Sequence, residues 1–448
     1  MTEKRAQTSG RFPPIFWLSN GVELCERAAY YGTFIALSMF LTDAAGFSDV
    51  ESGWIGAIFS SAIYFLPFLT GAISDRIGFR HALLLAFVLL SVGYAALGLH
   101  PGKLPVLASL ALIALGGSFV KPVITGTVAL TSGDSLRARA YSIFYMIVNI
   151  GSFTGKTIAK PVRTALGVGS VPLCSAVAAF VALALVFLFY RPLQASTARP
   201  RGASEVVHDL AVVLRNGRFL ALILITAGFW VIQGQLYASM PKYVVRMVGE
   251  GASPEWYANV NPFVVVLLVV PITHLVRKMQ PISSIAIALA LIPFSALIMA
   301  LSPAVGAGTT LFGYPVHPIT VMMVCGIAVQ GFAECFLSPR YLEYASRQAP
   351  AGQEGLYMGY AHLNVFFAWL IGFVMSGYLL DAFCPDPRTL SDADRAQRLA
   401  SLAGQGLMPS AYAKAHYIWY VFCAVGVAAF ASLLVYQAVV RRRETKRA

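Results

Sequence analysis

Apolar stretches of about 20 residues, the length that crosses the hydrocarbon core of a bilayer as a helix, recur along nearly the whole chain. Long apolar windows predict six helices near residues 15–41, 51–73, 80–99, 104–129, 139–162 and 168–190. Six more are expected near 218–244, 254–276, 281–303, 317–346, 354–381 and 412–440. Only 12% of the 448 residues are charged, against about 25% in an ordinary soluble domain. The sequence therefore predicts an all-α membrane protein of twelve transmembrane helices.

The segment 191–217 separates two sets of six helices, a bundle at 1–190 and a bundle at 218–448. Six helices, a basic linker and six more helices is a layout of secondary transporters whose halves rock about a central site. The layout alone does not name a substrate.

The net charge of +13 comes from basic residues in alternate loops, as membrane proteins place them. These residues are Arg76, Arg80, Arg137, Arg139, Arg191, Arg199, Arg201, Arg215, Arg277 and Lys278. The positive-inside rule puts these loops in the cytoplasm, together with Lys4, Arg5, Arg11 and the basic tail at 441–443, so both termini are expected inside. The lipid bilayer is the expected partner, and no nucleic acid is implied.

The cysteines and histidines show no arrangement typical of a disulfide framework, a metal site or a nucleophile. Five of the six cysteines fall in predicted helices, and Cys384 falls in an outer loop. No metal or cofactor is expected apart from protons as a coupling ion, and an intramembrane enzyme is disfavoured. The outer loop 384–410 is either an ordered cap or a plain tether.

The loop after the second helix contains Gly71-Ala-Ile-Ser-Asp75-Arg76-Ile-Gly78-Phe-Arg80. This string resembles the loop signature of the major facilitator superfamily. Its glycines allow a tight turn, and Asp75, Arg76 and Arg80 are expected to bridge helix ends when the inner gate is shut. A solvated basic loop would also obey the positive-inside rule, but it would not explain Asp75.

Helix 1 carries three ionisable residues within five positions, Glu23, Glu26 and Arg27. An ionisable group at mid-bilayer costs about 2.5 to 3.5 kcal/mol on insertion scales, so each one needs a partner or a purpose. The three side chains lie within roughly 60° of one another on the helix, and Tyr30 continues their face. Glu23 and Arg27 are expected to pair, which leaves Glu26 to seek a cation on another helix.

Lys121 of helix 4 is the expected partner of Glu26, because the two lie at similar depths when residues are counted at about 1.5 Å each. Asn149 of helix 5 lies at a similar level. The alternative is a static ion cluster that only joins helices.

Glu334 is the acidic residue expected well inside a helix of the second half. Arg340 is off its face, and a carboxyl without a cation in low-dielectric surroundings suits proton binding and release. A protonated acid bonded to the backbone is the structural alternative. Lys156, Lys160, Lys242 and Glu343 lie nearer helix ends, where snorkelling would explain them.

Several of these residues stand in strings that resemble the motifs of the proton-dependent oligopeptide transporter (POT) family. Residues 23–32 resemble its ExxER motif with the following tyrosines and glycine, residues 117–122 its helix 4 lysine segment, and residues 144–152 its helix 5 signature. Asn261-Pro262 and Glu334 with Leu337-Ser338-Pro339 also fit.

The resemblance implies proton-driven import of di- and tripeptides by alternating access in a major facilitator fold. It implies proton coupling by Glu23, Glu26, Arg27, Lys121 and Glu334. It implies substrate binding by Arg27, Tyr30, Tyr64, Lys121, Asn149, Trp230, Asn261 and Glu334. A cationic pole in the first half and an anionic pole in the second suit a zwitterion, and a monomer in a bacterial inner membrane is expected.

Three features depart from the family pattern. The family has a second arginine on helix 1, where this chain has Thr33-Phe34, and an acidic partner on helix 7, where this chain has Gly234. Loss of both avoids an orphaned buried charge, so a different outer gate and a different cargo are both open. The linker is also too short for the two additional helices common in bacterial members.

The rival to a peptide importer is a divergent transporter of another amphoteric or anionic metabolite, working as an exporter. A receptor that uses the fold without transport is disfavoured, because no signalling domain follows Val440.

Overall fold

The computed structural model describes residues 12–132, 136–191, 203–305, 310–311, 313–347 and 360–445. Contacts divide the chain into two compact units, the first made of residues 1–46 and 62–208 and the second of 47–61 and 209–448. Helix α3, Asp49–Phe65, contributes to both, because its residues up to Ser61 pack in the second unit.

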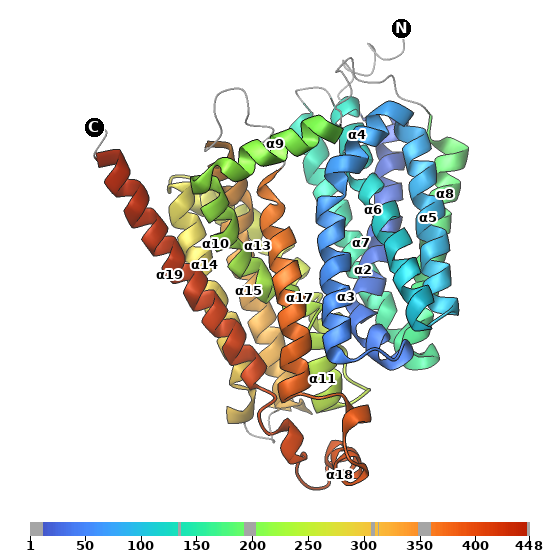
Figure 1. Cartoon of the computed structure of the whole chain (residues 1–448), viewed down its shortest axis with the longest axis vertical. Coiled ribbons are helices and arrows are strands. Elements are labelled where there is room, and N and C mark those ends of the chain that lie inside the picture. Colours follow the sequence, from blue (N-terminus) through green and yellow to red (C-terminus); the bar gives the residue numbers. More distant parts are fainter. Residues whose placement is uncertain are drawn as a thin grey trace. The chain divides into compact units, whose positions relative to one another are not determined.

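The first unit is a bundle of long helices (Figure 1). After α2 (Pro14–Met39) and the π-helix η1 (Phe40–Ala44) come the end of α3, α4 (Pro67–Ile77), α5 (Phe79–Leu99), α6 (Lys103–Thr131), α7 (Arg137–Leu166), η2 (Val168–Ser170) and α8 (Val171–Phe189). Helix α2 packs against α7 and α8, and α5 packs against α6 and α8. The polar face of α2 is therefore covered by its own bundle.

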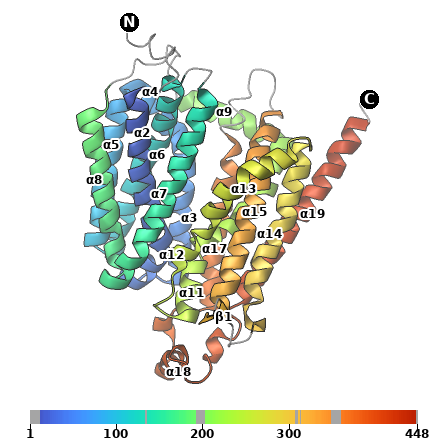
Figure 2. The same cartoon turned by 180° about the vertical axis from the view of Figure 1, so that it is seen from behind.

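The second unit is also helical, and Figure 2 shows α13, α14 and α15 side by side in it. Its long helices are α10 (Gly217–Gln233), α13 (Val260–Val276), α14 (Pro281–Ala300), α15 (Pro318–Arg347), α17 (Leu363–Phe383) and α19 (Tyr417–Thr445). Its short elements are η3 (Gly234–Leu236), α11 (Met240–Val248), α12 (Pro254–Tyr257), η4 (Ser302–Ala304), η5 (Pro387–Thr389), α18 (Asp392–Leu402) and η6 (Ser410–Tyr412). A two-stranded antiparallel hairpin, β1 (Thr310–Leu311) with β2 (Tyr314–Pro315), precedes α15.

The helical segments of the described chain match the twelve expected spans. Among the described residues, nine helices are long and apolar enough to cross a membrane, and α3 with α4 forms a tenth span bent by 45°. The bend falls at Pro67, whose missing N–H interrupts the helical hydrogen bonds. The remaining two, α2 and α7, carry several charged residues.

Helix 7 is broken where one helix was expected. It ends at Gln233, passes through the 3-10 turn η3, and restarts as α11, which has a proline in its first turn. This break turns α11 into a separate short helix beside α12 and α15.

The linker and the 384–410 segment both contain helices. Helix α9, Ala203–Arg215, is a single amphipathic helix in the linker, and α18 makes the 384–410 segment an ordered cap. Residues 192–202, the expected helix start at 354–359, Lys4, Arg5, Arg11 and the side chains at 441–443 lie outside the described residues. The bundle boundary and the cytoplasmic termini therefore stay predictions.

Candidate functional site

The acidic and basic residues of α2 form one buried ion cluster. The Arg27 guanidinium contacts the Glu26 carboxylate and lies 3.3 Å from Oε1 of Glu23. Both glutamates are almost fully buried, at 1% and 2% exposed. The expected pair between Glu23 and Arg27 is therefore confirmed. Glu26 also pairs within its own helix, so the expected ion pair between Glu26 and Lys121 is not formed.

Lys121 instead has an exposed side chain whose Nζ lies 5.9 Å from the ring centroid of Tyr64. That distance is within the range of a cation–π interaction. Arg27 lies at 5.4 Å from the ring centroid of Tyr30, and Asn149 donates a hydrogen bond of 2.8 Å to the Tyr145 carbonyl. Each of these two cations of the first unit, Arg27 and Lys121, therefore lies beside a tyrosine ring.

Glycines of α7 let it approach the ion cluster closely. A Cβ placed on Gly151 would lie 2.7 Å from the Cβ of Arg27, and one on Gly155 would lie 2.2 Å from the Ala28 carbonyl oxygen. No side chain fits at that separation, so α2 and α7 meet backbone against backbone. The glycines at positions 151 and 155 are therefore needed for α7 to pack on the Arg27 side of α2.

Glu334 lies in the second unit and has two amide partners. Its Oε2 accepts hydrogen bonds from Gln233 Nε2 at 2.6 Å and from Asn261 Nδ2 at 3.2 Å. Helices α10 and α13 thus each present an amide to the carboxyl of α15, contacts that the sequence did not predict. Arg340 is turned away, as expected, and pairs with Glu343 at 2.5 Å.

Gln233 is a site residue that the sequence reasoning missed. The available signal was an amide within an otherwise apolar helix, where it needs a hydrogen-bond partner. Its Oε1 and the Nε1 of Trp230 are buried without a hydrogen-bond partner among the described residues. One acceptor and one donor therefore lie on α10, the helix whose Gln233 donates a hydrogen bond to Glu334.

The three charged residues at the junction of α4 and α5, Asp75, Arg76 and Arg80, differ in their surroundings. Asp75 and Arg76 have exposed side chains, whereas Arg80 donates a hydrogen bond of 3.0 Å to the Phe187 carbonyl near the end of α8. Phe34 is buried and stacks on Tyr30 with centroids 5.1 Å apart, and a Cβ on Gly234 would lie 3.6 Å from Trp369. Aromatic rings therefore pack at positions 34 and 234, where the sequence lacks the charged residues expected from the family resemblance.

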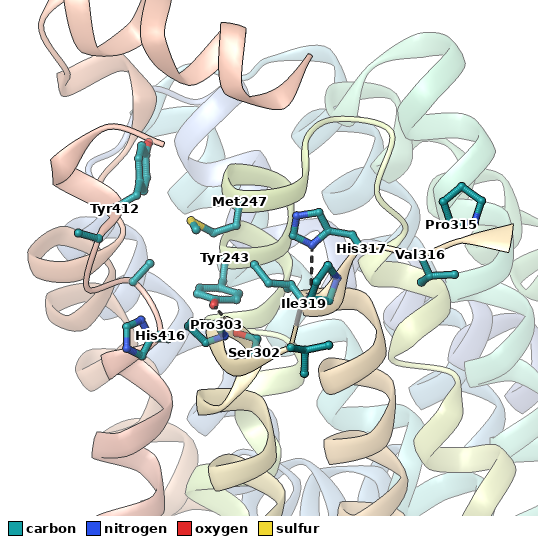
Figure 3. A pocket seen from close by; sticks show the side chains of 14 residues that line it. Tyr243, Met247, Ser302, Pro303, Pro315, Val316, His317, Ile319, Tyr412 and His416 are labelled. Carbon is teal, nitrogen blue, oxygen red and sulfur yellow. Dashed lines mark hydrogen bonds between the residues drawn. The ribbon is translucent and has the colours of Figure 1, made fainter. Parts of the chain in front are cut away.

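The second unit also has an open, mostly apolar cavity of about 540 Å³ (Figure 3). Tyr243, Met247, His317, Tyr412 and His416 are among its lining residues. His317 accepts a hydrogen bond of 3.2 Å from the Ile319 N–H, and burial lowers the pKa of its imidazole. None of the residues expected to bind substrate lines this cavity.

Comparison with protein families decides the classification. The profile described as Major Facilitator Superfamily matches residues 22–312, well over half of the chain. The chain belongs to the Major Facilitator Superfamily. This is a superfamily of membrane transporters, so the chain is a multi-pass integral membrane protein and not an enzyme.

Curated relatives divide between two kinds of transporter. Dipeptide and tripeptide permease A of Salmonella typhi is 31% identical over 157 residues, which cover 34% of this chain and 31% of the permease. Multidrug resistance protein MdtH of Aeromonas salmonicida is 23% identical over 364 residues, covering 78% of this chain and 84% of that protein. The chain spans about a third to a half of the length of the curated permeases it matches first.

Solved structures share the fold. A crystal structure of a POT family transporter in complex with 5-aminolevulinic acid matches with a TM-score of 0.73 at 19% identity. The match covers 95% of this chain and 96% of that one. The predicted major facilitator fold is confirmed.

Proposed function

We propose that this chain is a proton-coupled secondary transporter that imports di- and tripeptides or peptide-like zwitterions by alternating access. The observation that carries the proposal is the opposite charge of the two polar groups. Arg27 and Lys121 offer cations in the first unit, and Glu334 offers a carboxyl with amide partners in the second. A zwitterion carries one complementary charge for each group.

Charge balance supplies a reason for proton coupling. Glu23, Glu26, Arg27 and Lys121 together carry no net charge when all are ionised. A substrate carboxylate would add one negative charge beside two buried glutamates, and one proton on a glutamate would remove it. Oε2 of Glu23 is buried and has no hydrogen-bond partner among the described residues, so it can accept that proton. Substrate and proton are then expected to bind together.

The relatives support the substrate class. The permeases named above are described as dipeptide and tripeptide permeases, and the matched POT transporter was crystallised with 5-aminolevulinic acid, a zwitterion without a peptide bond. We place the protein as a monomer in a bacterial inner membrane.

A second candidate function is export of another amphoteric or anionic compound. The match to the multidrug resistance protein MdtH covers more of this chain than the permease match does. The replacement of the family's second arginine by Phe34 also removes a group that would hold a peptide carboxylate.

Uptake of a labelled dipeptide into proteoliposomes, with and without an inward proton gradient, tests the proposal. Gradient-driven accumulation that is lost in Glu26→Gln and in Lys121→Ala is the expected result. Glu51→Gln, at an exposed carboxylate of α3, is the matched control and should transport normally. Absence of dipeptide transport under any gradient, with proton-driven efflux of another compound, would favour the exporter.

A further inference from the structure

Helix α7 carries three buried cations on one face. Lys156, Lys160 and Arg163 are only 1%, 8% and 7% exposed. Lys242 of α11 is also buried, at 3% exposed, so the snorkelling expected for the three lysines is wrong. At 3.6 residues per turn, positions 156, 160 and 163 fall within about 60° of one another on the helix. Helix α7 therefore has a cationic face inside the first unit.

The same face of α7 includes a residue expected to bind substrate. Asn149 and Ser152 precede Lys156 by seven and four residues, a spacing that places all three on one face of a helix. Lys156 is the first of the three buried cations after Asn149, about 10 Å further along the helix axis. The cationic face thus continues the polar face that begins at Asn149.

The first unit has few buried carboxylates to balance these cations. Among the residues that the structure describes there, the buried carboxylates are Glu23 and Glu26 of α2. The other described carboxylates of that unit are exposed, namely those of Asp43, Asp75 and Glu205. The sequence of α7 itself contains neither aspartate nor glutamate. Buried positive charge therefore exceeds buried negative charge in the described part of this unit.

Lys156 is close to Arg27, because both cations lie beside one aromatic ring. Helices α2 and α7 are neighbours (Figure 2), and Lys156 Nζ lies 5.7 Å from the ring centroid of Tyr31. The Arg27 Cζ lies 5.9 Å from the same centroid. The two cations are therefore at most about 12 Å apart, and salt screens buried charges little at such a separation. Lys156 thus adds positive charge near the cation expected to hold a substrate carboxylate.

We propose that Lys156 makes the protein select substrates that carry a second negative charge, such as dipeptides with an acidic side chain. This inference rests on the proposed function and names its substrate class. The two glutamates and two cations of the proposed site cancel in charge, and one proton balances one substrate carboxylate. The charge of Lys156 then balances a further acidic group. Because its side chain is buried, Lys156 acts through its electric field and not by contact.

Binding of two isosteric peptides tests this charge preference. The full chain in nanodiscs is titrated at pH 7 with Ala-Glu and with Ala-Gln, which differ by one ionised carboxylate, and calorimetry gives each Kd. We expect the parent protein to bind Ala-Glu about tenfold more tightly than Ala-Gln. In Lys156→Met this ratio should fall to about one, with little change in the Kd of Ala-Gln.

Two further variants separate charge from packing. Lys156→Arg keeps the charge and should keep the preference for Ala-Glu. Lys103→Met removes an exposed lysine from the start of α6 and is the matched control, which should also keep it. Equal affinity of the parent for the two peptides, or an unchanged ratio in folded Lys156→Met, would overturn the proposal. If Lys156→Met does not fold, Lys156→Gln decides in the same way, because it also removes the charge.

Failure of the proposed function gives a different result. If the parent binds neither peptide, the peptide class is wrong. Glutarate and its monoamide, glutaramate, then test the same preference without a peptide bond. Tighter binding of glutarate by the parent but not by Lys156→Met supports selection by Lys156. Equal binding of the two acids, or no binding of either, overturns it.

Discussion

Gln233 donates a hydrogen bond of 2.6 Å from its Nε2 to Oε2 of Glu334, a residue 101 positions later in the chain. Asn261 donates to the same oxygen, so helices α10, α13 and α15 converge on one carboxyl oxygen. One carboxyl oxygen of α15 therefore accepts two amide hydrogen bonds from two other helices.

The Glu334 carboxyl should be essential for substrates with a free amino group. Glu334→Gln removes the negative charge, and hydrogen bonds to charged groups contribute about 1.5 to 3 kcal/mol. We therefore expect the KM for a dipeptide to rise by about tenfold or more in proteoliposome uptake. Glu343→Gln, on the same helix, is the control, because Arg340 keeps its bonds to the Val276 and Met279 carbonyls. Equal loss in both variants would contradict a specific role.

Arg27 should stabilise the fold as well as bind substrate. Arg27→Met would leave two buried carboxylates without their cation, and breaking a buried pair costs about 3 to 5 kcal/mol. We expect a marked fall in the melting temperature of the purified protein. Addition of Glu26→Gln should recover part of that loss, and a double variant no more stable than Arg27→Met alone would show that Glu26 and Arg27 are not coupled.

The backbone contact between α2 and α7 should tolerate no added methyl group. Gly155→Ala places a Cβ 2.2 Å from a backbone oxygen, and such overpacking costs about 1 to 3 kcal/mol. Thermal unfolding should show the destabilisation. Gly21→Ala in α2 has nothing within 4 Å of the new methyl group and should leave the melting temperature unchanged or raise it. Equal stability of the two variants would refute the packing argument.

The 384–410 cap should loosen only in acid. Burial opposes the charge of Asp386, but hydrogen bonds from the Arg388 side chain and N–H, with Arg246 nearby, hold the pKa of this carboxyl below its usual range. Such a group adds stability above its unfolded pKa of about 4, and this stability is lost as the pH falls through the lower folded value.

Hydrogen exchange of the cap, corrected for the intrinsic pH dependence, should therefore be flat from pH 8 to 5 and rise below about pH 4. Asp386→Asn should lose that acid-dependent step. An unaltered step in the variant would assign it to another group.

Sequence patterns predicted where the helices lie along the chain better than which helices contact one another. Apolar windows placed all the long helices, because a bilayer imposes one length on every span. The motif on α2 likewise predicted the pair between Glu23 and Arg27, which lie four residues apart in one helix.

Contacts between helices were harder to predict. Counting residues gives the depths of Glu26 and Lys121 along their helices but not the direction in which each side chain points. Glu26 pairs with Arg27 of its own helix, and the ion pair with Lys121 that was expected from depth is absent. Asp49 and Lys242 are separated by 193 positions and lie at helix ends, where snorkelling was the simpler expectation. Gln233 could not be assigned to Glu334 for the same reason, because no local pattern records which helices are neighbours.

Helix α3 begins at Asp49, which pairs with Lys242, and its last turn contains Tyr64, the ring beside Lys121. Roughly 22 Å of unbroken helix separates the two residues, and such a rod transmits a displacement at one end to the other. Occupancy near Lys121 and formation of the ion pair between Asp49 and Lys242 should then be thermodynamically linked, with each altering the other by the same factor. One helix would make ligand recognition and this ion pair a single equilibrium.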